Sequence, residues 1–318
     1  MYTRLALLGL SLLLLLSCNK GGTSSSKEQS AQTTTASTVQ AFPYPQIPAT
    51  LTDPAERLAY MLNHYWDGYD FSDTLLMQNR DVTEQGFVNF VALLADPNAT
   101  PQHREQAMQH YSKGVASNPK ALQQMGDLTE RYLYTPTSPL HNEELYTLYL
   151  QQLLLQLPAD EPHRSTMEYT LTLMGRNNVG DEATNFNYIT PNGTNGTLHA
   201  TKVKGKRLLI FFYDPDCESC HHYMDLMHDD SQLKEWVKQG KLTVLAVNTQ
   251  HPDERWPKAQ ERMPQGWVHV CDQMQVTEQG LYDLKGMPTF ILTDPHYKVV
   301  LKDPTYEELM LALNSTLQ

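Results

Sequence analysis

Residues 207–220 are Arg-Leu-Leu-Ile-Phe-Phe-Tyr-Asp-Pro-Asp-Cys-Glu-Ser-Cys, and this stretch decides the fold of the carboxy-terminal half. Its first seven residues form a continuous apolar run of strand length, as expected for a strand that is covered on both faces. The stretch between Cys217 and Val237 has the apolar spacing of a helix. The two cysteines therefore lie where a strand passes into a helix. There the unsatisfied N–H groups of the first turn favour thiolate over thiol.

Further strands are expected on both sides of this unit. Phe186–Ile189 and Thr197–Ala200 flank a Pro-Asn-Gly-Thr-Asn-Gly segment and predict a β-hairpin. Leu242–Val247 and Trp267–Cys271 are two more apolar runs of strand length. Strands that alternate with helices predict an α/β sheet with helices on both faces.

The sequence Lys285-Gly286-Met287-Pro288-Thr289-Phe290 leads into another apolar strand about seventy residues after the dithiol. This layout, with the C-x-x-C pair after a strand, resembles the thioredoxin superfamily. The hairpin from Phe186 and the Lys204–Leu209 segment resemble the envelope thioredoxins of the TlpA/ResA type, and the resemblance covers about Val179 to Gln318. It implies an α/β thioredoxin-like fold and a cis peptide bond before Pro288, a minority state in X-Pro bonds. It also implies that Met287, Pro288 and Thr289 bind an extended substrate segment.

The implied reaction is dithiol–disulfide exchange, in which Cys217 is the nucleophile and Cys220 resolves the mixed disulfide. No dissociable cofactor is implied. Asp216 stands where the family usually has Trp, Ser219 replaces a common Pro, and Phe211 stands where many thioredoxins bury a carboxylate. The helix start favours a thiolate at Cys217, but the carboxylates of Asp214, Asp216 and Glu218 lie close to the same sulfur and together outweigh it. This balance predicts a reductant or an isomerase-like partner rather than a strong oxidant.

The same residues allow other interpretations. Cys217 to His221 is also C-x-x-C-H, the attachment motif of c-type haem. Zinc would need four ligands from Cys217, Cys220, His221, His222 and Cys271, but adjacent histidines on a helix diverge by about 100 degrees. We therefore expect that these residues do not form a metal site. Cys271 fits a packed thiol better than a third redox partner. A non-catalytic binding module with a structural disulfide is a further alternative.

Residues 45–178 predict an independent all-α domain. Asp53 and Pro54 are a helix start signal. Further helices are expected near Thr83–Leu94, Pro101–Val115, Pro119–Tyr132, Asn142–Leu157 and His163–Met174. This half resembles an uncharacterised helical domain that precedes thioredoxin domains in some envelope lipoproteins, and that likeness carries no activity. We therefore predict domains at 45–178 and 179–318.

The amino-terminal residues predict export. Residues 1–17 have the charged start and short apolar core of a signal peptide, which is too short to span a bilayer. Leu15-Leu16-Ser17-Cys18 resembles the bacterial lipobox, so Cys18 is the expected site of lipid attachment. Residues 18–44 are largely polar and predict a disordered tether. We expect a lipid-anchored protein of the cell envelope that faces the periplasm of a Gram-negative bacterium.

The net charge and its distribution along the chain indicate which classes of partner the protein can bind. The net charge of −12 is spread along the chain, without the basic stripe that phosphate binding needs. We therefore expect no nucleic-acid partner. The expected partners are disulfide-containing envelope proteins and an upstream electron donor.

Overall fold

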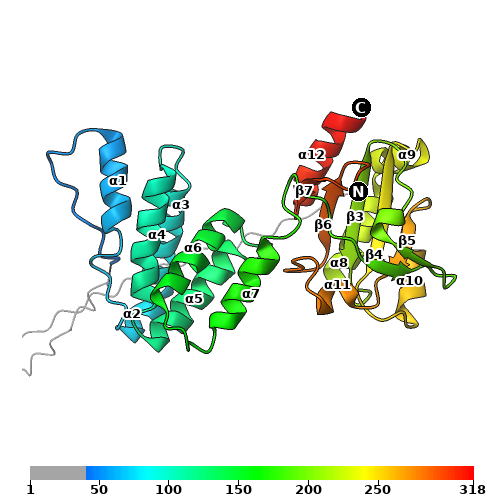
Figure 1. Ribbon diagram of the computed structural model, residues 1–318. Coiled ribbons are helices and arrows are strands. Elements are labelled where there is room, and N and C mark those ends of the chain that lie inside the picture. The colour runs from blue at the N-terminus through cyan, green and yellow to red at the C-terminus, as the bar shows by residue number, and fades with distance from the viewer. Residues whose placement is uncertain (1–40) are drawn as a thin grey trace, which may run out of the picture. The chain divides into compact units, whose positions relative to one another are not determined.

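The computed structural model describes residues 41–318 (Figure 1). The predictions of a signal peptide, of lipid attachment at Cys18 and of most of the tether fall outside the described residues. No helix among residues 41–318 combines the length and the apolar character that crossing a membrane requires.

The first half is helical, as predicted, and its cap residues explain where the helices begin. Asp53, Thr100, Asn118 and Asn142 each accept backbone N–H bonds at a helix start. The helices are α1 (Pro54–His64), α2 (Thr74–Gln78), a π-helix η1 (Arg80–Glu84), α3 (Gln85–Leu94), α4 (Pro101–Val115), α5 (Pro119–Leu133), α6 (Glu143–Gln156) and α7 (Arg164–Met174).

An aromatic cluster forms the centre of the helical half. Tyr65, Trp66 and Tyr69 are buried, and Trp66 packs edge-on against Tyr65 and Phe90. Such contacts add to the energy of area burial. These rings therefore serve as core rather than as the lining of a groove.

The second half is a seven-stranded mixed sheet in the order β2-β1-β5-β4-β3-β6-β7. The strands are β1 (Asn187–Ile189), β2 (Asn195–Thr197), β3 (Arg207–Tyr213), β4 (Leu242–Asn248), β5 (Val268–Cys271), β6 (Thr289–Thr293) and β7 (Val299–Lys302). Strand β3 runs parallel to β4 and antiparallel to β6. It thus lies at the centre of the sheet, as its unbroken apolar run predicts.

The two faces of this sheet are covered differently. Leu209 and Phe211 face a core shared with α8 (Glu218–Asp229), α9 (Ser231–Lys238), α10 (Arg255–Glu261) and α12 (Tyr306–Leu317). Leu208 and Ile210 face a second core. That core is shared with α11 (Gln275–Glu278), the 3₁₀ turn η2 (Leu198–Ala200) and the segments around Phe186 and Tyr282. Helices therefore lie on both faces, as expected, but unevenly, because one face has four helices and the other has only the short α11 and η2.

Two predicted elements end earlier than expected. The second hairpin strand stops at Thr197, because its side chain accepts the Ala200 N–H and starts η2. The single helix expected up to Val237 is two helices. Asp230 ends α8 and its carboxylate caps α9 by accepting from Gln232 and Leu233.

Candidate active site

Cys217 lies in a turn that the sequence builds from two aspartates and a proline. The Asp214 carboxylate accepts the Asp216 N–H at 2.8 Å, and the Cys217 N–H donates to the Asp214 carbonyl at 3.1 Å. Cys217 is the N-cap residue of α8, and its Sγ accepts the Cys220 N–H at 3.2 Å. The partly exposed sulfur thus lies at the positive end of a helix, where negative charge is stabilised.

The segment before β6 lies against this sulfur. The Met287–Pro288 peptide bond is cis, as the family resemblance implied. The Cys217 thiol donates to the Met287 carbonyl at 3.5 Å, and Thr289 pairs with Phe212 at the end of β3. Met287 and Pro288 are partly exposed beside Cys217. The predicted nucleophile and the predicted substrate-binding residues therefore meet where β3 ends and β6 begins.

Cys220 differs from Cys217 in its surroundings. Its side chain is fully buried. Burial and the contact with the Cys217 thiol raise the pKa of Cys220 far above its usual value. Phe211 stacks on Tyr213 and Phe290, so the place of the family's buried carboxylate is filled by an aromatic ring. Cys220 is thus a protonated, shielded thiol in the reduced protein.

An arginine near the dithiol was not identified from the sequence. Arg255 of α10 forms an ion pair with Asp216 and a second pair with Asp253. Hydrogen bonds from Arg255 lower the pKa of Asp253 to about 2. The repulsion expected from the carboxylates around Cys217 is therefore partly offset, because Arg255 neutralises Asp216. Because Arg255 and Asp216 are 39 positions apart, no local sequence pattern indicates that they pair.

The geometry also bears on the alternative sites. His221 Nε2 lies 2.7 Å from the Pro215 carbonyl, and Cys220 is shielded from solvent. Both features hinder haem attachment, which needs two accessible sulfurs and a free imidazole nitrogen. Within residues 41–318, no three His, Cys, Asp or Glu side chains are grouped to hold a metal ion. Cys271, the third cysteine among residues 41–318, is buried in β5 and donates to the Gln250 carbonyl at 3.0 Å. Burial raises its pKa to about 11.

Comparison with protein families separates the two halves of the chain. A model for a domain of unknown function, DUF5106, matches residues 17–177, which is half of the chain. The chain belongs to the DUF5106 family. A model for a thioredoxin-like domain matches residues 195–306. The chain thus has a thioredoxin-like domain in its carboxy-terminal region, preceded by the DUF5106 domain.

Solved structures resemble both halves. A thioredoxin-like protein from Bacteroides caccae is 28% identical, with a TM-score of 0.72, and the match covers 87% of this chain and 99% of that chain. Two further structures come from Bacteroides fragilis. A conserved protein of unknown function is 34% identical, with a TM-score of 0.40. The C-terminal domain of an uncharacterized protein is 27% identical, with a TM-score of 0.41. Each of these two matches covers 43% of this chain and 98% of the other. A search of the curated proteins found no match.

Proposed function

We propose that this DUF5106-family chain is a thiol–disulfide oxidoreductase that reduces or exchanges disulfides of cell-envelope proteins. One observation carries the proposal: the N-cap sulfur of Cys217 lies 3.5 Å from the carbonyl that precedes cis-Pro288. In that arrangement the sulfur lies at the start of a helix, and the Met287 backbone lies beside it, where an extended peptide can pair with it.

The reaction proceeds through two exchanges. The Cys217 thiolate attacks one sulfur of a substrate disulfide, which forms a mixed disulfide and releases the other substrate sulfur as a thiolate. Cys220 then loses its proton and attacks the Cys217 sulfur, which forms the Cys217–Cys220 disulfide and releases the second substrate thiol. Two electrons pass to the substrate. A dithiol electron donor must return them before the next turnover.

The burial of Cys220 supports this order of events. A buried thiol of raised pKa is a poor nucleophile toward an outside disulfide. It can still attack a sulfur that is bonded to its neighbour Cys217. The partly exposed Cys217 is therefore the thiol that meets the substrate.

A trapping experiment tests the assignment. In a Cys220→Ser variant the second exchange cannot occur, so substrate proteins should remain bonded to Cys217 and be released by dithiothreitol. The matched control is the Cys217→Ser/Cys220→Ser double variant, which should trap nothing. Purified parent protein should reduce insulin in the presence of a dithiol donor. A parent protein that reduces neither insulin nor small disulfides would contradict the proposal.

We also propose that the protein is lipid-anchored through Cys18 and faces the periplasm of a Gram-negative bacterium. The Leu15-Leu16-Ser17-Cys18 sequence supports this proposal. A Cys18→Ala variant should leave the membrane fraction, whereas the parent should remain in it. Equal fractionation of the two proteins would refute the anchor.

A further inference from the structure

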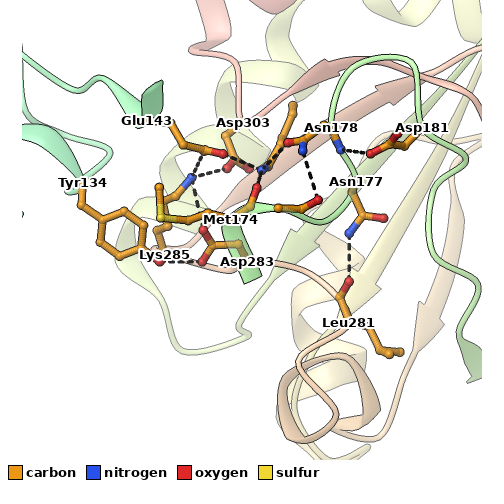
Figure 2. A network of polar contacts seen from close by, with 12 residues as sticks. Tyr134, Glu143, Met174, Asn177, Asn178, Asp181, Leu281, Asp283, Lys285 and Asp303 are labelled. Carbon is orange, nitrogen blue, oxygen red and sulfur yellow. Dashed lines mark hydrogen bonds and ion pairs between the residues drawn. The ribbon is translucent and has the colours of Figure 1, made fainter. Parts of the chain in front are cut away.

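A buried lysine lies two residues before Met287. The Lys285 side chain is only 2% exposed. A buried ammonium group is costly unless it is paired and hydrogen-bonded. Lys285 Nζ lies 2.6 Å from Glu143, 2.8 Å from Asp303 and 3.4 Å from Asp283 (Figure 2). Three carboxylates therefore hold the residue that leads into the Met287–Pro288 segment.

One of these carboxylates belongs to the DUF5106 domain. Glu143 is the first residue of α6 and is separated from Lys285 by 142 positions. Its second oxygen accepts from Lys302 at 2.6 Å. Burial opposes the ionisation of Glu143, but the two lysines hold its pKa below the usual value. Glu143 is thus a charged acceptor shared by Lys285 and by Lys302 at the end of β7.

A second residue of the DUF5106 domain contacts the same segment. The Tyr134 hydroxyl donates to Asp283 at 2.7 Å, and Lys285 Nζ lies 5.4 Å from the centre of the Tyr134 ring. Figure 2 shows Tyr134 and Glu143 reaching Asp283 and Lys285 from the helical domain. Two residues of the helical domain, Tyr134 and Glu143, therefore bind the side chains of Asp283 and Lys285.

These contacts are close in sequence to the reactive sulfur. Lys285 is followed by Gly286, whose carbonyl accepts from Thr289 at 2.7 Å. Met287 comes next, and its carbonyl accepts from Cys217. A shift of Lys285 would be passed along this short, hydrogen-bonded turn to the backbone that faces the substrate.

We propose that the DUF5106 domain positions the substrate-binding segment of the thioredoxin-like domain, with Glu143 and Tyr134 holding Lys285 and Asp283. This inference rests on the proposed function, because it assigns a task to the segment beside Cys217. Glu143, Tyr134 and Lys285 are positioning residues, since none of them touches the reacting sulfurs. The inference gives the helical domain a role in recognising extended protein disulfides.

A comparison of two substrates tests the inference. Insulin carries its disulfides on polypeptide chains, whose backbone can pair with Met287, whereas hydroxyethyl disulfide has no backbone. Glu143→Gln keeps the size of the side chain but removes its charge. We expect this variant to lose about tenfold or more in kcat/KM for insulin, because small misplacements of a binding segment are costly. Reduction of hydroxyethyl disulfide should change less than twofold.

Glu144→Gln is the matched control. Glu144 is the next residue of α6, its side chain is 83% exposed and it lies 3.9 Å from Arg104. It carries the same charge change without touching Lys285, so it should behave as the parent does. Tyr134→Phe is a second test variant, which keeps the ring and removes the bond to Asp283. It should show the same selective loss of insulin reduction.

The outcomes separate the two proposals. Unchanged insulin reduction in Glu143→Gln and Tyr134→Phe, an equal loss for both substrates, or an equal loss in Glu144→Gln would overturn the positioning role. Hydrogen exchange of the peptide 281–290 gives a readout without turnover, and it should be faster in Glu143→Gln than in Glu144→Gln. If the parent reduces neither substrate, the proposed function fails, and equal exchange in the two variants would overturn the positioning role independently.

Discussion

Cys217 is the N-cap residue of α8 as well as the proposed nucleophile, so its replacement should affect stability as well as activity. Its sulfur accepts the Cys220 N–H at 3.2 Å and thereby satisfies one unpaired group of the first helical turn. Replacing an N-cap acceptor with alanine typically costs about 0.5–2 kcal/mol. A hydroxyl is a better acceptor than a thiol sulfur. Cys217→Ser therefore keeps the cap, Cys217→Ala removes it, and both variants should be inactive.

Thermal unfolding in excess reductant measures the difference. For domains of 150–250 residues, 1 kcal/mol corresponds to about 2–4 °C in Tm. A loss of about 0.5–2 kcal/mol should therefore make Cys217→Ala melt about 1–8 °C below Cys217→Ser. Both variants lack the nucleophile, so neither can form the Cys217–Cys220 disulfide. Ser219→Ala changes an exposed residue of the same turn and should melt with the parent. Equal melting of the two Cys217 variants would refute the capping role.

Three further expectations follow from the site and the core. Iodoacetamide should alkylate Cys217 of the reduced native protein and leave the buried Cys220 unmodified until unfolding, as mass spectrometry would show; equal labelling would contradict the assigned order of attack. Arg255→Gln removes the cation beside Asp216 and should make the dithiol potential more negative, whereas Asp216→Asn should make it less negative; shifts of the same sign in glutathione buffers would contradict this. Burial raises the pKa of Asp272 from 3.8 to about 6. Between these two values the folded state holds a proton that the unfolded state releases. The stability that this group contributes therefore falls as the pH rises from about 4 to 6. Relative to Asp272→Asn, the parent should lose up to roughly 3 kcal/mol across that window in urea unfolding; parallel pH profiles would contradict the shift.

Elements with strong local signals could be predicted from the sequence. Pro101–Val115 was predicted with its observed bounds, because Thr100 caps it and Pro101 suits a first helical turn. Arg207–Tyr213 was also predicted with its observed bounds, because a strand at the centre of a sheet needs an unbroken apolar run. Leu242–Val247 is one residue shorter than the observed strand.

Elements that depend on tertiary packing were missed. The five-residue helix α2 (Thr74–Gln78) is too short for a helical period to be detected. Strand β7 was not predicted either, although it completes the sheet beside β6. The pairing of Asp216 with Arg255 and of Glu143 with Lys285 depends on how distant segments meet, which no local pattern in one sequence contains.

The contacts between the two halves differ in kind from the contacts within each half. The buried apolar core of the helical half and the two cores of the sheet each draw their residues from one half alone. Between the halves lie polar contacts such as Glu143 with Lys285, Lys302 with the Met174 carbonyl and Asn177 with the Leu281 carbonyl.

Bonds of this kind are directional and depend on geometry, whereas apolar burial depends mainly on area. A change in such contacts can therefore alter the placement of the segment before Pro288 without dismantling either core. Because the apolar cores maintain the fold and the polar contacts position the segment, we expect Glu143→Gln to lose insulin reduction selectively.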